Sequence, residues 1–216
     1  PAIWNGFPLL EYDTGGYLAR WFEGYLVPSR STVYGLFLAL GAHPDFWPVA
    51  IVQAALTVWV LALLLRTHGF GERPLALPAV TALLCLGTTL PWLASILLTD
   101  IFAALAVLAL HLLVFCDDRL RRFERPALVI LIGFAAATHS ATFAVVMALL
   151  LALVLTRVLS RTVAAAGILS GIAALALGAA MLLAANFATS GRLAWTPGGI
   201  ALSFGRMLQE GIVQRY

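Results

Sequence analysis

The few residues of this chain that could take part in catalysis or binding lie at the ends of long apolar stretches. Asp13 lies in the sequence Glu-Tyr-Asp-Thr-Gly-Gly-Tyr, and Asp100 opens an apolar run. An ionisable group at membrane depth is costly, so it marks a functional site by default. An acid at the start of a helix also has a structural use, because it caps the helix or suits its dipole. Both interpretations stay open for each aspartate.

Histidine adds a third candidate for proton transfer. His139 lies where a turn interrupts an apolar stretch, and it is either a catalytic group or a hydrogen-bonded structural residue. His43 and Asp45 belong to a predicted loop, and His111 is expected to pack inside the helix bundle. The candidate catalytic set is Asp13, Asp100 and His139.

Arginines and tyrosines near Asp13 supply candidate binding groups. The guanidinium groups of Arg20 and Arg30 suit phosphate oxygens, because their donors form a fixed fork. Long arginine side chains at a membrane surface also snorkel toward water without binding anything. The candidate substrate-binding set is Tyr12, Tyr17, Arg20 and Arg30.

Other familiar chemistry is missing from the sequence. Cys85 and Cys116 lie in apolar runs, where a buried structural thiol is expected, and neither has the spacing of a metal site. There is no glycine-rich phosphate loop, serine nucleophile elbow, HExxH or CxxC motif. The metal ligands therefore stay unknown, and a divalent cation is only a candidate cofactor.

The composition places these residues in a membrane. Of 216 residues, 62% are hydrophobic and 11% are charged, whereas soluble domains carry roughly 25% charged residues. So few charges cannot cover a water-exposed surface. The net charge of +3 comes without a nucleic-acid patch, so membrane lipid is an expected partner and nucleic acid is not. This composition predicts an all-α, polytopic transmembrane helix bundle.

The apolar stretches predict six membrane spans. A bilayer core about 30 Å thick needs about 20 helical residues. The stretch 127–156 admits two interpretations: one long tilted helix, or two short helices that meet at residues 138–140. With two helices, the predicted spans are 47–65, 75–90, 99–115, 127–141, 142–156 and 162–185.

Arginine placement favours the two-helix interpretation, because cytoplasmic loops collect basic residues. All 13 basic residues are arginine, which suits a bacterial coding bias. Loops 66–73 and 117–125 carry six of them, and Arg157 and Arg161 join the same side only if 127–156 crosses twice. The opposite face then holds most of the irregular sequence. We therefore expect a multi-pass protein of a bacterial inner (plasma) membrane, with a periplasmic or extracellular functional face.

The two ends of the chain are predicted to lie on that outer face. Residues 1–46 form an outer loop with interfacial helices at 16–25 and 32–40, the second capped by Ser29 or Ser31. Residues 187–216 form an outer loop or amphipathic segment. Because the chain starts at proline and stops within that segment, we expect it to be a piece of a longer protein.

The order of these features resembles the GT-C class of membrane glycosyltransferases, which use polyprenyl-phosphate sugars. Members of that class carry an acid in the first outer loop, then interfacial helices, and often a second acid before a later span. In this chain Asp13, the two interfacial helices and Asp100 match that order, within residues 1–120. The chain departs from the class in having a lone aspartate where many members have an acidic pair. It also resembles uncharacterised bacterial polytopic membrane proteins.

The resemblance implies roles for the candidate residues. Asp13 would act as a base or activate the acceptor, and Asp100 would assist it or hold a divalent ion. Arg20 or Arg30 would face the lipid phosphate. Sugar transfer needs a carboxylate near the acceptor and positive charge near the departing phosphate.

Two functions from different classes follow. A lipid-linked glycosyltransferase predicts that Asp13 and Asp100 approach within about 10 Å around one outward-open cavity. A non-catalytic membrane subunit, packed against partner proteins or pigments, predicts no shared cavity. It predicts instead a small-residue face at Gly167, Gly171 and Gly178 packed on neighbouring helices.

Overall fold

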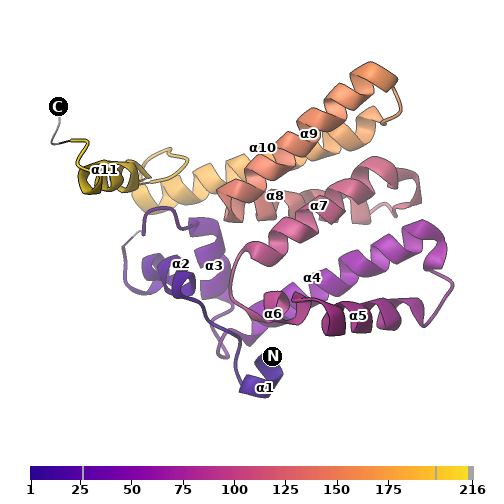
Figure 1. The fold of residues 1–216 in the computed structure, drawn as a ribbon, viewed down its shortest axis with the longest axis horizontal. Helices are drawn as coiled ribbons and strands as arrows, with labels where there is room; N and C mark the ends of the chain where they lie inside the picture. Colours follow the sequence, from indigo (N-terminus) through magenta and orange to yellow (C-terminus); the bar gives the residue numbers. More distant parts are fainter. Residues whose placement is uncertain (26, 198, 214–216) are drawn as a thin grey trace.

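The computed structural model describes residues 1–25, 27–197 and 199–213, and within these the fold is all-α, as the composition predicts (Figure 1). Residues 198 and 214–216 of the predicted C-terminal segment lie outside the described residues. The helices are α1 (Ala2–Asn5), α2 (Tyr12–Phe22), α3 (Thr32–Leu40), α4 (Trp47–Leu65), α5 (Ala76–Gly87), α6 (Leu90–Ser95), α7 (Asp100–Phe115), α8 (Glu124–Thr138), α9 (Ser140–Ser160), α10 (Ala165–Ser190) and α11 (Gly199–Gln209), with short turns η1 (Arg66–Phe70) and η2 (Asp117–Arg119).

Among the described residues, three helices are long and apolar enough to cross a membrane. They are α4 continued through η1, α9 and α10, with mean hydropathies of 2.3, 2.4 and 2.3. Helices of this length and apolar composition are typical of an integral membrane protein. Helices α5, α7 and α8 are shorter, with 12, 16 and 15 residues. Three of the six predicted spans therefore lie in helices below the usual spanning length of about 17–25 residues.

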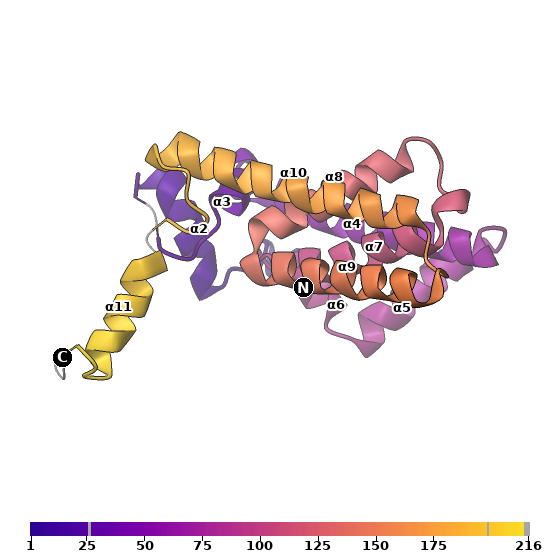
Figure 2. The same cartoon turned by 90° about the horizontal axis from the view of Figure 1, so that it is seen from above.

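The stretch that the sequence left ambiguous consists of two helices. Helix α8 ends at Thr138, α9 begins at Ser140, and His139 between them has an extended backbone with φ −151° and ψ 123°. Because an extended residue cannot continue the helical hydrogen-bond ladder, the chain reverses direction there (Figure 2).

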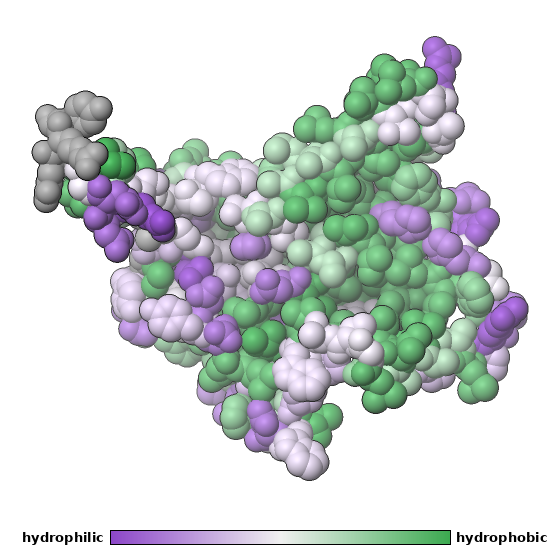
Figure 3. Space-filling view, in the orientation of Figure 1, coloured by the Kyte–Doolittle hydropathy of each residue, from purple (hydrophilic) through white to green (hydrophobic). Residues whose placement is uncertain are grey.

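Long helices run between two polar ends of the bundle. At the arginine-rich end, Arg66 is ion-paired with Glu124, and Arg119 donates to the Thr67 carbonyl. At the other end, which holds α2 and α3 and is called here the α2–α3 end, Ser31 donates to the carbonyl of Ala137 at 2.9 Å. Figure 3 shows hydrophobic residues over the middle of the molecule and hydrophilic residues toward both ends.

The core forms around α8, which packs against both α7 and α10. Small residues permit this closeness: a β-carbon added to Gly178 would lie 2.7 Å from the Gly133 carbonyl oxygen. By contrast, α5 contributes no buried residue and lies at the edge of the bundle. Its Cys85 is exposed, so the prediction of a buried thiol was wrong there, although Cys116 is buried as predicted.

Two helix boundaries near the α2–α3 end differ from the sequence prediction. Helix α2 begins at Tyr12 and not at residue 16, because Glu11 and Thr14 form a capping box that starts it earlier. Helix α10 continues to Ser190, so Asn186 lies inside it and not after it. Helix α3 has the predicted bounds, and Ser31 caps it by accepting from the Tyr34 amide at 3.3 Å.

Candidate functional site

An ion pair between α2 and the loop before α3 is the centre of the α2–α3 end. Asp13 lies in the first turn of α2, and its carboxylate is bonded to the guanidinium of Arg30. The capping interpretation of Asp13 was wrong, since Glu11 occupies the N-cap position. Both side chains are partly exposed, at 38% for Asp13 and 28% for Arg30, so ligands from solvent can reach them.

Packing fixes the position of the Arg30 side chain. It passes over Gly16, where an added β-carbon would lie 3.0 Å from the Arg30 Cγ atom. Its guanidinium carbon is 5.7 Å from the centre of the Tyr17 ring, within range of a cation–π contact. The space over Gly16 is therefore filled by an arginine of the same chain. Arg30 is held in place before any ligand arrives.

The charges of both candidate carboxylates act on the side chain of Tyr17. The ring is buried and meets Tyr34 edge to face, with centroids 4.9 Å apart. Burial raises the pKa of Tyr17 above its ordinary value of 10.0. A hydrogen bond with Thr99 and the charge of Arg30 oppose this rise, and the charges of Asp13 and Asp100 add to it. Asp13, Asp100 and Arg30 therefore act electrostatically on the same side chain, although they come from three separate segments.

A cavity of about 200 Å³ opens beside this ion pair. Arg30 and His139 both line it, and the remaining walls come from the ends of α8, α10 and the segment after α10. Drug-sized ligands occupy roughly 300–1,000 Å³, so this cavity has room for one head group and not for a whole lipid. The cavity lining comprises Ser29, Arg30, Ser31, Ala136, Ala137, Thr138, His139, Ser140, Leu182, Asn186, Trp195, Thr196 and Pro197.

Asn186 is the functional position that the sequence prediction missed. It is buried at 3% exposure, accepts from the Thr32 hydroxyl, and donates to the carbonyls of Ala194 at 2.8 Å and Trp195 at 3.1 Å. These bonds hold the segment after α10 against α3 and so build one wall of the cavity. The signal was present, because a lone amide inside an apolar helix needs buried partners.

Three other residues that the sequence suggested, Asp100, Tyr12 and Arg20, are not among the residues that line the cavity. Asp100 is exposed at the first residue of α7 and does not line the cavity. Tyr12 is 92% exposed. Arg20 donates to the carbonyls of Gly24 at 2.8 Å and Thr189 at 2.6 Å. Its guanidinium therefore joins the end of α10 to α2, which is a structural use.

His139 keeps a position suited to chemistry. It is half-buried, lines the cavity, and serves as a helix N-cap without a capping side-chain hydrogen bond. Imidazole is the side chain most often used for general acid–base catalysis. The cavity thus offers an imidazole and a guanidinium, and the carboxylate of Asp13 is bonded to that guanidinium. Neither Asp13 nor Asp100 is among its lining residues, so the expected cavity shared by the two aspartates is not found at this pocket. Comparisons with protein-family models, curated proteins and solved structures give no match to this chain.

Proposed function

We propose that this integral membrane protein transfers a sugar from a polyprenyl-phosphate carrier, in the manner of the GT-C class, on the non-cytoplasmic face of a bacterial inner membrane. One observation carries the proposal: Arg30 lines the cavity that His139 also lines, and the same guanidinium is paired with Asp13. In this arrangement Arg30 can bind an anionic head group in the cavity, and it also holds the carboxylate that would act in catalysis.

Charge decides what the cavity can hold. Arg30 is the cationic side chain among the described lining residues, and its fork of donors matches phosphate oxygens. A phosphate that approaches Arg30 competes with Asp13 for the guanidinium. Binding of the carrier would therefore loosen the ion pair and release a carboxylate to act as general base on the acceptor hydroxyl. The guanidinium would meanwhile stabilise the negative charge of the departing phosphate.

Substitution at the ion pair tests this proposal. Arg30→Gln should reduce polyprenyl-phosphate-sugar turnover in membranes by about 100-fold or more, and Asp13→Asn should reduce it comparably, because each removes a charge used in the transition state. Asp100→Asn tests the second acid in the same assay. Arg192→Gln and Asp45→Asn are matched controls, since both residues are exposed and neither lines the cavity.

The controls should keep full turnover. If Arg30→Gln and Asp13→Asn also keep it while the folded protein is recovered in normal yield, the transferase proposal fails. The non-catalytic subunit would then be the better account of the chain. The glycine face predicted for such a subunit packs on helices of this bundle, where a β-carbon on Gly167 would lie 2.5 Å from the Leu113 carbonyl oxygen.

A further inference from the structure

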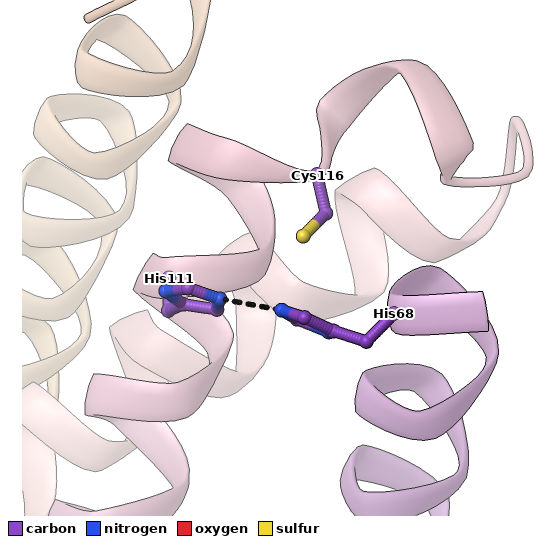
Figure 4. A group of neighbouring side chains, drawn as sticks. All are labelled: His68, His111 and Cys116. Carbon is purple, nitrogen blue, oxygen red and sulfur yellow. Dashed lines mark hydrogen bonds between the residues drawn. The ribbon is translucent and has the colours of Figure 1, made fainter. Parts of the chain in front are cut away.

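Two histidines and a cysteine meet at the arginine-rich end, away from the α2–α3 end. His68 comes from η1 after α4, His111 from the last part of α7, and Cys116 from the residue that ends α7 (Figure 4). Their ligand atoms all lie within 4.8 Å of one another. Nε2 of His111 and Nε2 of His68 are 3.4 Å apart. Figure 4 shows the cysteine sulfur beside the gap between the two rings.

The spacing of the nitrogen atoms matches a tetrahedral metal centre. Zinc binds imidazole nitrogen at about 2.0–2.1 Å, so two nitrogens at a tetrahedral angle lie about 3.3 Å apart. The observed 3.4 Å agrees with that value. Zinc–sulfur bonds of about 2.3 Å place sulfur about 3.6 Å from each nitrogen. The observed upper bound of 4.8 Å between ligand atoms exceeds this value. A side-chain rotation that moves the Cys116 sulfur by roughly 1 Å closes the difference.

A backbone contact favours the tautomer of a neutral His68 ring that a metal needs. Its Nδ1 atom lies 2.8 Å from the carbonyl oxygen of Leu64. A carbonyl only accepts, so Nδ1 carries the hydrogen, and the Nε2 atom of the neutral ring presents its lone pair toward His111. Metal-binding histidines are held in this way, with the other ring nitrogen donating to a carbonyl or carboxylate.

Burial of the three groups also suits a metal site. Cys116 is buried at 4% exposure, His111 is half-buried and His68 is exposed, so the cluster has a protected thiol and an entry path. A hydrogen bond between the two histidines is the alternative use of this contact. A hydrogen bond alone does not explain why the Cys116 sulfur also lies within 4.8 Å of a nitrogen of each ring.

We infer that His68, His111 and Cys116 bind one zinc-class divalent ion through two imidazole nitrogens and a thiolate. Three protein ligands leave the fourth position to solvent, and the ion ties the end of α4 to the end of α7. The inference is independent of the transferase proposal, because the cluster shares no residue with the cavity.

Metal titration of the reduced, detergent-solubilised protein tests the inference. Titration with Co²⁺ should give one ion per chain, with thiolate-to-cobalt charge-transfer absorption and the strong visible bands of tetrahedral Co²⁺. Zn²⁺ should displace Co²⁺ and abolish both signals. His68→Gln, His111→Gln and Cys116→Ser should each weaken Zn²⁺ binding by more than about 100-fold, the loss that removal of outer-shell partners alone can reach.

The chain supplies a matched control for each ligand type. His43→Gln and Cys85→Ser change an exposed histidine and an exposed cysteine outside the cluster, and both should keep native Zn²⁺ affinity and the charge-transfer band. The inference is overturned if the native protein shows no charge-transfer band. It is also overturned if His43→Gln or Cys85→Ser weakens binding as much as the cluster variants do. The native spectrum decides the question even if a cluster variant fails to fold.

Discussion

Single polar residues in this molecule act by joining segments that are far apart in the chain. Arg30 contacts Asp13 and Tyr17, and Asn186 joins α3 to the segment after α10. Gln53 does the same on α4, where its buried amide donates to the Ile96 carbonyl at 2.9 Å. A buried polar group without a partner costs about 1–3 kcal/mol, so each of these residues specifies one arrangement of its neighbours.

The buried tyrosines predict a loss of stability at alkaline pH. Burial raises the pKa of both Tyr17 and Tyr34 above the ordinary value of 10.0. A raised folded-state pKa means that the unfolded chain loses its phenolic protons first. The stabilisation is therefore complete below pH 10 and is lost as the pH rises through the folded-state values. Thermal unfolding in detergent, followed from roughly pH 8 to 11, should show the midpoint fall above pH 10.

Phenylalanine variants assign this fall to the buried rings. Tyr17→Phe and Tyr34→Phe should flatten the alkaline part of the curve, because a ring without a hydroxyl has no proton to lose. Tyr12→Phe, at a position 92% exposed, should leave the curve as it is. An identical alkaline fall in all three variants would refute the assignment.

Glycine residues on α10 allow this helix to pack closely against α7 and α8. Gly167 on α10 meets the backbone of α7, and Gly178 meets that of α8. Small residues allow such approaches in membrane proteins, where dispersion and close contact take the place of the hydrophobic effect between helices. The predicted small-residue face at Gly167, Gly171 and Gly178 is therefore packed on neighbouring helices of the same bundle.

Alanine substitution separates a packing glycine from a free one. In Gly167→Ala the new β-carbon would lie 2.5 Å from the Leu113 carbonyl oxygen and 2.6 Å from the Val114 Cα atom, so α7 and α10 must move apart. We expect a loss of about 1–3 kcal/mol in unfolding free energy, measured by denaturant titration in detergent. Gly15→Ala on α2 has no neighbour within 4 Å and should be neutral or stabilising by about 0.5–1 kcal/mol. Equal effects at both sites would contradict the packing argument.

The whole molecule separates its polar groups into two ends with different chemistry. The α2–α3 end holds the cavity and the Asp13–Arg30 pair. The arginine-rich end holds the ion pair between Arg66 and the buried Glu124, together with the histidine–cysteine cluster. Apolar residues cover the middle of the molecule (Figure 3). In a bilayer, the two ends would face opposite compartments.

Accessibility labelling tests that separation. Asp45→Cys and Asp118→Cys, each in a Cys85→Ser background, place an exposed thiol at opposite ends, while the native Cys116 is buried. A membrane-impermeant maleimide added outside sealed vesicles of uniform orientation should label only one of the two variants. The other should react after detergent opens the vesicles. Labelling of both variants from the same side would refute the two-ended arrangement.

Composition and local pattern by themselves determined the all-α class and the bounds of α3, and they narrowed its cap to Ser29 or Ser31. They also favoured helix ends at residues 138–140 over one long helix, because arginine placement called for two crossings and a polar Thr-His-Ser sequence interrupts the apolar run. These features depend on nearest neighbours and on burial of whole segments, which hydropathy and capping chemistry report directly.

Only the tertiary structure decided which polar groups meet. The partners Asp13 and Arg30 are 17 positions apart, and His68 and His111 are 43 apart. The sequence prediction placed His111 inside the bundle and found no metal spacing, although its own topology put residue 68 and residue 116 at the same end. What it lacked was the rotation of α4 and α7 about their axes. That rotation is set by the packing of the whole bundle, because no local pattern fixes which face of an almost uniformly apolar helix turns toward its neighbour.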